Sequence, residues 1–127
     1  MTRILIADDS PPLRCGLHTL LGLNADWQVC GEAVDGLDAV EKAHQLTPDL
    51  ILMDFSMPQM DGVQAARKIA ESGTDIPILL FTLNLSPQIM ELARNAGLRG
   101  AISKAEISKL PYAIKALQCG ETFFYAS

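Results

Sequence analysis

Three aspartates stand where short apolar stretches of the sequence end. Asp8 and Asp9 follow the stretch Ile4–Ala7, and Asp54 follows the stretch Leu50–Met53. Carboxylates that are crowded together and partly removed from water repel one another and are costly to keep ionised. A cluster of three therefore calls for a positive counter-charge. A hard divalent cation with oxygen ligands meets this need, and Mg²⁺ is the cation that we expect.

A hydroxyl group and an ammonium group follow two further apolar stretches. Thr82 comes directly after Ile78–Phe81, and Lys104 closely follows Ala101–Ile102. A carboxylate is a competent nucleophile toward phosphorus, a metal ion offsets charge on the phosphoryl oxygens, and an ammonium adds a second positive contact. These residue types therefore fit phosphoryl transfer to a carboxylate, a reaction in which positioning would provide most of the catalysis.

These side chains need a scaffold that brings distant segments to one edge. Short, nearly all-apolar stretches alternate with segments that have helical spacing, and such stretches are typical of parallel strands covered on both faces. The alternation predicts an α/β fold, a five-stranded parallel doubly wound sheet with five helices. Ligands of such sheets bind beyond the carboxyl ends of the strands, where the polar residues would meet. The predicted strands are Ile4–Ala7, Val29–Val34, Leu50–Met53, Ile78–Phe81 and Ala101–Ile102.

Capping residues mark the ends of several predicted helices. Ser86 followed by Pro87 indicates a helix N-terminus, and Gly97 indicates the end of that helix. Asp61 is interpreted as a helix cap rather than a ligand. Residues 120–127, GETFFYAS, contain no further periodic segment. The second predicted helix would bury Leu37, Val40 and Ala43.

The composition narrows the class of protein. A chain of 127 residues is long enough for one domain with its own core. A net charge of −5 argues against direct binding of a nucleic-acid backbone. No membrane span or secretory signal is expected, because the first acids come too early and no apolar stretch is long enough, so we expect a cytoplasmic protein. Cys15, Cys30 and Cys119 share no metal-type spacing and are expected to be reduced thiols that pack as small apolar side chains.

The ordered set of motifs resembles the receiver domain of two-component response regulators over essentially the whole chain, residues 1–127. The resemblance rests on the acidic pair, on D-x-x-M-P-x-x-D-G at Asp54–Gly62, and on Thr82 and Lys104 after the fourth and fifth strands. It implies a flavodoxin-like or CheY-like sheet with strand order 2-1-3-4-5. It also implies that Asp54 accepts a phosphoryl group from a phosphohistidine on a sensor histidine kinase, so the domain catalyses only its own phosphorylation and dephosphorylation.

The resemblance also implies roles for individual residues. Asp9 and Asp54 would coordinate Mg²⁺ together with the main-chain carbonyl of Ser56, and Asp8 would contribute through water. Lys104 would contact the phosphoryl group and would pair with Asp54 before phosphorylation. Thr82 would be the switch hydroxyl that turns a local charge change into movement of the following loop. No organic cofactor is implied.

Two departures from the family pattern concern the switch. Ala101 stands where relatives usually carry a tyrosine or phenylalanine that moves with the threonine, and Ala105 stands where many have a proline after a cis peptide. We therefore expect activation to move the loop 83–86 and the helix after it, with little change around Ala101. Asn84 and Ser56 are expected to influence the lifetime of the phosphorylated form.

The end of the chain, LPYAIKALQCGETFFYAS, resembles regulators of the NarL/FixJ (LuxR-type) subfamily, which continue into a DNA-binding helix-turn-helix domain. A linked DNA-binding domain that lies outside this sequence and a stand-alone receiver both remain open. Binding to DNA would then occur only through that linked domain, and a homodimer could form on phosphorylation. A third interpretation is a pseudo-receiver that acts as a docking or dimerisation module without phosphorylation. A Mg²⁺-dependent phosphohydrolase of the haloacid-dehalogenase type is disfavoured, because Ser56 stands where that type needs a second aspartate.

Overall fold

A computed structural model describes residues 1–125, and its strands and helices alternate along the chain. The strands are β1 (Thr2–Ala7), β2 (Trp27–Ala33), β3 (Leu50–Met53), β4 (Ile78–Thr82), β5 (Gly100–Ser103) and β6 (Phe123–Phe124). The α-helices are α1 (Pro11–Leu21), α2 (Gly36–Leu46), α3 (Gly62–Glu71), α4 (Pro87–Asn95) and α5 (Leu110–Gln118). A 3₁₀-helix, η1 (Lys104–Lys109), connects β5 to α5.

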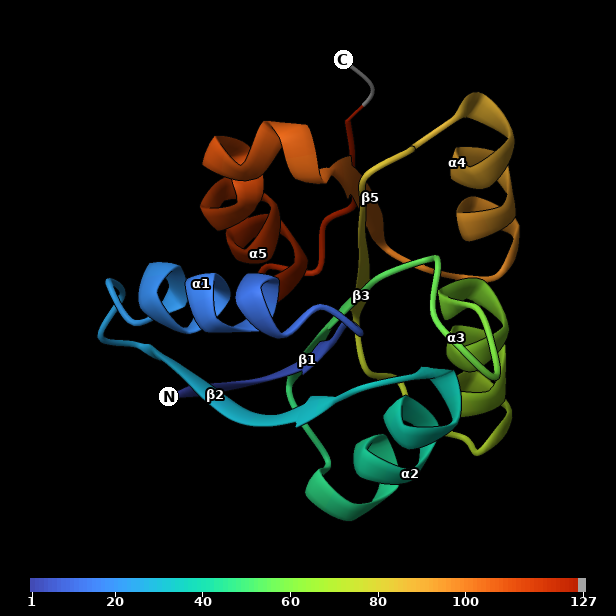
Figure 1. Ribbon diagram of the computed structural model, residues 1–127, viewed down its shortest axis with the longest axis horizontal. Coiled ribbons are helices and arrows are strands. Elements are labelled where there is room, and N and C mark those ends of the chain that lie inside the picture. Colours follow the sequence, from blue (N-terminus) through green and yellow to red (C-terminus); the bar gives the residue numbers. More distant parts are fainter. Residues whose placement is uncertain (126–127) are drawn as a thin grey trace.

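The strands form one parallel sheet with the order β2-β1-β3-β4-β5-β6. The predicted five-stranded order 2-1-3-4-5 is therefore confirmed for the core of the sheet. The chain leaves β1 toward β2 on one side and later returns to β3 on the other side, so the direction of winding reverses between β1 and β3 (Figure 1). Such a reversal opens a crevice beyond the carboxyl ends of these two strands.

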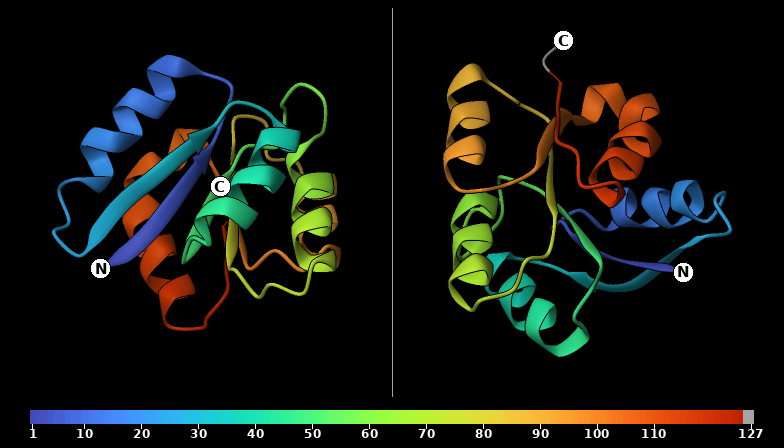
Figure 2. Two further views of the ribbon diagram at one scale, coloured as in Figure 1. Left: turned by 90° about the horizontal axis from the view of Figure 1, so that it is seen from below. Right: turned by 180° about the vertical axis from the view of Figure 1, so that it is seen from behind.

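Helices cover both faces of the sheet. Helices α1 and α5 lie on one face, and α2, α3 and α4 lie on the other (Figures 1 and 2). Each face has its own apolar cluster, so side chains that alternate along a strand are buried on either side. All four residues of β3 are buried, which explains why this strand is apolar throughout.

Side-chain caps set the starts of four of the α-helices, because each cap satisfies one of the unpaired N–H groups in a helix's first turn. The predicted caps Ser86 and Asp61 are confirmed, since they accept hydrogen bonds from the main-chain N–H groups of Ile89 and Gln64 at 3.1 and 2.9 Å. The other caps are Ser10 of α1 and Asp35 of α2. None of the helices described within residues 1–125 is long and apolar enough to cross a bilayer.

Some side-chain predictions were wrong. Leu37 is 50% exposed, because the buried stripe of α2 runs through Gly36, Ala39 and Ala43. Cys15 and Cys119 are exposed rather than packed, although all three cysteines are free thiols. These predictions relied on local side-chain spacing alone. Which face of a helix is buried depends also on where the neighbouring elements lie in the fold.

Two short elements near the C-terminus were not predicted. Strand β6 lies within residues that the sequence left without a periodic element, and it pairs with the edge of β5. A strand of two residues is too short to carry a periodic signal. The last two residues of that stretch lie outside the described residues. Helix η1 follows Ser103, whose hydroxyl accepts a hydrogen bond from the N–H of Ala105, and the described chain contains no cis peptide there or elsewhere.

Candidate functional site

The ends of β1 and β3 bring two aspartates together. Ala7 and Met53 are register partners, so the residues that follow them, Asp8 and Asp54, emerge side by side. The main-chain N–H of Asp54 donates to the carbonyl of Ala7 at 2.9 Å, which continues the ladder past the last paired residues. Carboxylate oxygens of Asp8, Asp9 and Asp54 all lie within 4.8 Å of one another. The structure therefore brings the three predicted acids into one cluster.

Lys104 reaches this cluster from the start of η1, directly after the end of β5. Its Nζ lies 2.7 Å from Oδ2 of Asp8 and 3.2 Å from Oδ2 of Asp54. The expected pair with Asp54 is present, and the contact with Asp8 is the shorter one. Since only 10% of the lysine side chain is exposed, its ammonium group offsets the carboxylate charges in a poorly solvated place.

Asp54 is 6% exposed, and this burial raises the pKa of its carboxyl above the ordinary value. The charge of Lys104 and the hydroxyl of Thr82 act in the opposite direction, while the charge of Asp8 adds to the increase. The ionised form of Asp54 is thus held at some cost to the fold, and a positive partner lowers that cost.

A small hollow of about 100 Å³ opens above Asp54. Three predicted site residues, Asp54, Thr82 and Lys104, line it, and Thr82 is buried at the end of β4. Ser56 and Asn84, which the sequence singled out as modulators, also line the hollow together with Leu83. Asp8 and Asp9 belong to the neighbouring acidic cluster, and Ala101 lies on β5, fully buried.

The loop after β3 folds back tightly over Asp54. The N–H of Gly62 donates to the carbonyl of Phe55 at 2.9 Å, which places the start of α3 against the main chain of the aspartate. A Cβ atom at Gly62 would lie 2.0 Å from the Asp54 carbonyl oxygen. This close approach is the physical reason for glycine at the last position of the D-x-x-M-P-x-x-D-G motif.

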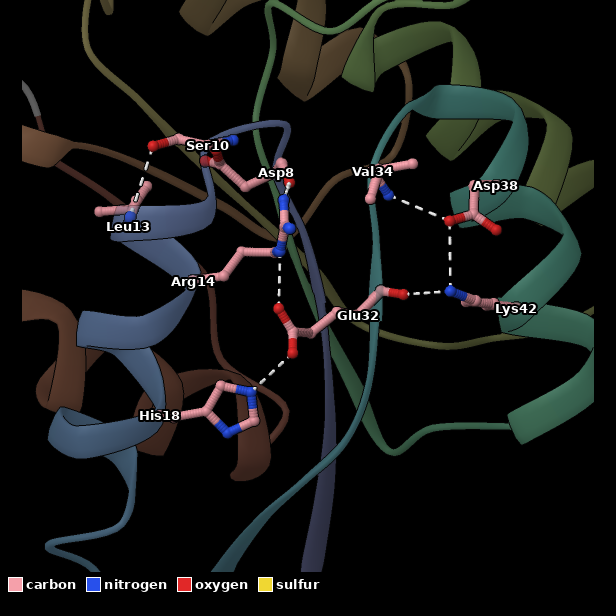
Figure 3. A network of polar contacts seen from close by, with 9 residues as sticks. All are labelled: Asp8, Ser10, Leu13, Arg14, His18, Glu32, Val34, Asp38 and Lys42. Atoms are coloured by element: carbon pink, nitrogen blue, oxygen red, sulfur yellow. Dashed lines mark hydrogen bonds and ion pairs between the residues drawn. The ribbon is translucent and has the colours of Figure 1, made fainter.

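A polar network supports the acidic cluster from α1 and β2 (Figure 3). Arg14 on α1 donates through Nη1 to the main-chain carbonyl of Asp8 and through Nε to Oε1 of Glu32 on β2, both at 2.6 Å. The N–H of Ser10 donates to Oδ1 of Asp8 at 2.8 Å. The turn that carries Asp8 and Asp9 is therefore held through both its main chain and its first side chain.

Glu32 is the centre of this network. Its Oε2 lies 3.0 Å from Nε2 of His18, and its main-chain carbonyl accepts a hydrogen bond from Lys42 of α2 (Figure 3). Partial burial acts to raise the pKa of the Glu32 carboxyl, but the hydrogen bonds and charges of His18 and Arg14 outweigh it and lower the pKa. Glu32 thus stays ionised and connects β2 to α1 through its contacts with Arg14 and His18.

The donor set suits a magnesium ion. Three carboxylates from two neighbouring strand ends supply hard oxygen ligands within a few ångströms, which is the chemistry that Mg²⁺ requires. Both oxygens of Asp8 already accept hydrogen bonds or an ion pair, from the Ser10 N–H and from Lys104. Asp9 is exposed beside them.

Sequence reasoning missed Arg14, Glu32 and the packing role of Gly62. One signal for Arg14 was present, since it is the one basic residue in the first turn and a half of a helix that follows two acids. Glu32 also interrupts a strand that is otherwise free of charge. Neither signal identifies the partner, because Arg14 and Glu32 are 18 positions apart and meet only in the fold.

Comparison with known protein families agrees with this geometry. The family model described as "Response regulator receiver domain" matches residues 4–118. The response regulator protein VraR of Staphylococcus aureus is 35% identical over 123 residues, which make up 96% of this chain and 59% of VraR. The chain thus spans less than two thirds of the length of this relative.

Solved structures give the same result. The crystal structure of a LuxR-family two-component response regulator from Aurantimonas sp. SI85-9A1 has a TM-score of 0.93 at 30% identity, with 97% of this chain and 89% of that chain covered. The isolated REC domain of RcsB from Salmonella enterica serovar Typhimurium, in the presence of the phosphomimetic BeF3⁻, has a TM-score of 0.89 at 26% identity. That match covers 98% of this chain and 93% of that one.

Proposed function

Because this chain belongs to the response regulator receiver domain family, we propose that Asp54 accepts a phosphoryl group from the phosphohistidine of a sensor histidine kinase. Receiver domains of this family are signalling domains rather than classical enzymes. One observation carries the proposal. Of the three clustered acids, which all lie within residues 1–125, Asp54 alone lines the small hollow that also contains Thr82 and Lys104.

The chain's own residues suggest how the transfer proceeds. A carboxylate oxygen of Asp54 attacks phosphorus, the bond from phosphorus to the imidazole nitrogen breaks, and its electron pair stays on the imidazole. Lys104, which pairs with Asp54 beforehand, exchanges that partner for a phosphoryl oxygen. The ammonium group of Lys104, at the start of η1, thus stabilises negative charge both before and after the transfer.

Asp9 and Asp54 would hold Mg²⁺ together with the main-chain carbonyl of Ser56, and Asp8 would act through water. The two hydrogen-bonding partners of Asp8 support this indirect role, and the exposure of Asp9 supports a direct one. When bound, the metal ion offsets charge on the phosphoryl oxygens.

Thr82 would pass the signal on. Its side chain lines the same hollow as Asp54, and it ends β4 directly before the loop 83–86. A phosphoryl group on Asp54 adds acceptor oxygens, so the hydroxyl can donate to it and draw the loop along. Ser56 and Asn84 line the hollow as well, and we infer that they set the lifetime of the acyl phosphate by controlling the position of an attacking water.

The output would be transcription control. The similarity to LuxR-family regulators supports a linked helix-turn-helix domain outside residues 1–127, through which DNA would be bound. We include dimerisation on phosphorylation and a cytoplasmic location in this proposal. A docking module that works without phosphorylation is the second candidate, and the observation in its favour is the alanine at position 101, where the family's moving ring is absent.

Intact mass spectrometry tests the proposal. We expect incubation with acetyl phosphate and Mg²⁺ to add one phosphoryl group, and chelation with EDTA to prevent it. Asp54→Asn should remove the label completely, since an amide is not a nucleophile of this kind. Asp61→Asn is the matched control, because asparagine caps a helix as well as aspartate does and Asp61 only caps α3. Label that persists in Asp54→Asn would contradict the assignment.

A further inference from the structure

Strand β6 supplies an aromatic ring next to the alanine that interrupts the family pattern. Phe124 of β6 is the register partner of Ala101 in β5, and the N–H of Tyr125 donates to the carbonyl of Ala101 at 2.9 Å. Register partners in a sheet present their side chains on the same face. The ring of Phe124 packs against the apolar cluster that contains Ala101, whereas Phe123 packs against the other cluster.

The ring of Phe124 also touches α4, the helix that follows the loop 83–86, which we call the switch loop. The guanidinium carbon of Arg94 on α4 lies 4.1 Å from the centre of the ring, which is a cation–π contact. Phe124 lines a second hollow together with Leu85, Ser86 and Met90, which belong to the end of the switch loop and to α4. The ring therefore lies between β5 and the segment that Thr82 would move.

This second hollow has room for a ring. Its volume is about 330 Å³, whereas an apolar cavity of roughly 150 Å³ already accepts benzene. Ser103, which comes directly after Ile102 in β5 and precedes Lys104 of the site, also lines it. The hollow thus extends from the end of β5 beside the site to the ring of β6.

We propose that Phe124 acts as the aromatic member of the switch in place of the missing ring at position 101. When Thr82 turns toward phosphorylated Asp54, the loop 83–86 shifts, and the ring of Phe124 moves into the hollow beside Met90. The main chain of β6 follows its side chain, so the hydrogen bond from Tyr125 to Ala101 weakens. The edge of β5 at Ala101 thus changes more than the sequence alone leads us to expect. The signal then leaves the domain through β6, and this inference rests on the proposed phosphorylation of Asp54.

A second contact joins the residue after β6 to η1. Nζ of Lys109 at the end of η1 lies 4.8 Å from the ring centre of Tyr125, and η1 begins with Lys104. The rings of Phe123 and Tyr125 are stacked, with centroids 6.4 Å apart, on the α5 face of the sheet. Phe124 is the one of these three rings that packs against the apolar cluster of Ala101, although Tyr125 also lines the hollow. The proposed movement concerns the ring of Phe124.

Amide hydrogen exchange with and without the phosphomimetic BeF3⁻ and Mg²⁺ tests the inference on the whole chain. We expect the loop 83–86 to respond, and the protection of the Tyr125 amide to fall about tenfold, which is within the usual range for coupled sites. Phe124→Leu keeps an apolar side chain but has no ring. In this variant the loop response should remain while the change at Tyr125 falls below about twofold, because the coupling passes through the ring.

Phe123→Leu is the matched control. It makes the same change in the same strand but on the opposite face, so the coupling between the loop and Tyr125 should survive. Arg94→Gln is a milder second variant that removes the cation from the ring and keeps Phe124. We expect it to change the protection of Tyr125 before BeF3⁻ is added, because the resting position of the ring depends on that contact.

The outcomes separate this inference from the proposed function. A loop that responds to BeF3⁻ while Tyr125 stays unchanged would overturn the role of Phe124 and leave the phosphorylation of Asp54 standing. Equal loss of coupling in Phe123→Leu and Phe124→Leu would also overturn it, since β6 would then act as a simple edge strand. No response at either place, together with no phosphoryl uptake, would overturn both.

Discussion

Two regions on either side of the same site are built differently. One is the turn that carries Asp8, and the other is formed by the loop 83–86 together with strand β6. Around Asp8, charged side chains bridge α1, β1 and β2 through hydrogen bonds of 2.6 to 3.0 Å. Around Phe124, the contacts are apolar or cation–π, and they surround a hollow of about 330 Å³. The first region is cross-linked, and the second has space to rearrange.

The difference matches the demands of the chemistry. Phosphoryl transfer needs carboxylates that are already in position, since misplacement of a reacting group by an ångström is costly. A switch needs two arrangements of similar free energy, and a hollow bordered by weak contacts permits both. Under the proposed function, the turn of Asp8 would be a fixed side for phosphoryl transfer and the region around Phe124 would be a movable side for signalling, and each of the following predictions tests this division.

Gly62→Ala should have the largest effect, because Gly62 lies on the fixed side, where its main chain packs directly against that of Asp54. The new Cβ would lie 2.0 Å from the carbonyl of Asp54, so the loop must shift. We expect the free energy of unfolding to fall by about 3 kcal/mol or more, together with loss of phosphoryl uptake. Urea denaturation and intact mass spectrometry measure the two effects.

Gly16→Ala provides the control for this prediction. Gly16 lies in α1 with nothing within 4 Å of its would-be Cβ, so alanine should raise the free energy of unfolding by about 0.5 to 1 kcal/mol. Equal effects of the two substitutions would contradict the account of Gly62.

Arg14→Met removes the cross-link between Asp8 and Glu32. We expect a loss of about 2 kcal/mol in the free energy of unfolding, because two hydrogen bonds of a charged group disappear. Affinity for Mg²⁺ should also fall about tenfold, since the turn that carries Asp9 is no longer held. Arg67→Met, at an exposed position of α3, should change neither quantity by much. Unchanged Mg²⁺ affinity in Arg14→Met would contradict the claim that Arg14 helps to position the metal-binding acids.

Removing one helix cap in each of the two regions compares them directly. Ser10→Ala and Ser86→Ala each remove a capping hydroxyl, and each should lower the free energy of unfolding by about 1 kcal/mol. Mg²⁺ affinity should fall only in Ser10→Ala, because loss of the hydrogen bond from Leu13 to the Ser10 hydroxyl loosens the turn between Asp8 and α1, whereas the main-chain N–H at position 10 can still donate to Asp8. In Ser86→Ala the loosening should appear as faster amide exchange at Ile89. A fall in Mg²⁺ affinity in both variants would argue against two separable regions.

The smallest expected effect concerns pH. Because the pKa of Glu32 is lower in the folded protein than in the unfolded chain, Glu32 adds stability above its unfolded pKa of about 4.3. This contribution disappears as pH falls through the folded pKa. Glu32→Gln should thus cost less than about 1 kcal/mol at neutral pH, since the side chain is 39% exposed, and nothing in strong acid. Melting curves of both proteins from pH 3 to pH 7 test this. A stability difference between Glu32→Gln and the original chain that grows as the pH falls would contradict the lowered pKa of Glu32.

The sequence by itself determined most of the scaffold. Apolar stretches of strand length, alternating with helical segments, were sufficient for the α/β class, and they located the acids and the lysine at strand ends. Caps such as Ser86 and Asp61 were also readable, because a cap hydrogen-bonds to the N–H only three residues ahead. Such signals are local, so no knowledge of the neighbouring elements is needed to interpret them.

The tertiary structure alone decided which distant groups meet. Lys104 pairs with Asp8 as well as with Asp54, and Arg14 finds Glu32, because strand order and register bring these segments together. Strand β6 exists for the same reason: two residues hold no strand signal of their own, but the open edge of β5 offers main-chain partners. Phe124 therefore comes to lie opposite Ala101 through long-range pairing, which leaves no trace in the local sequence pattern.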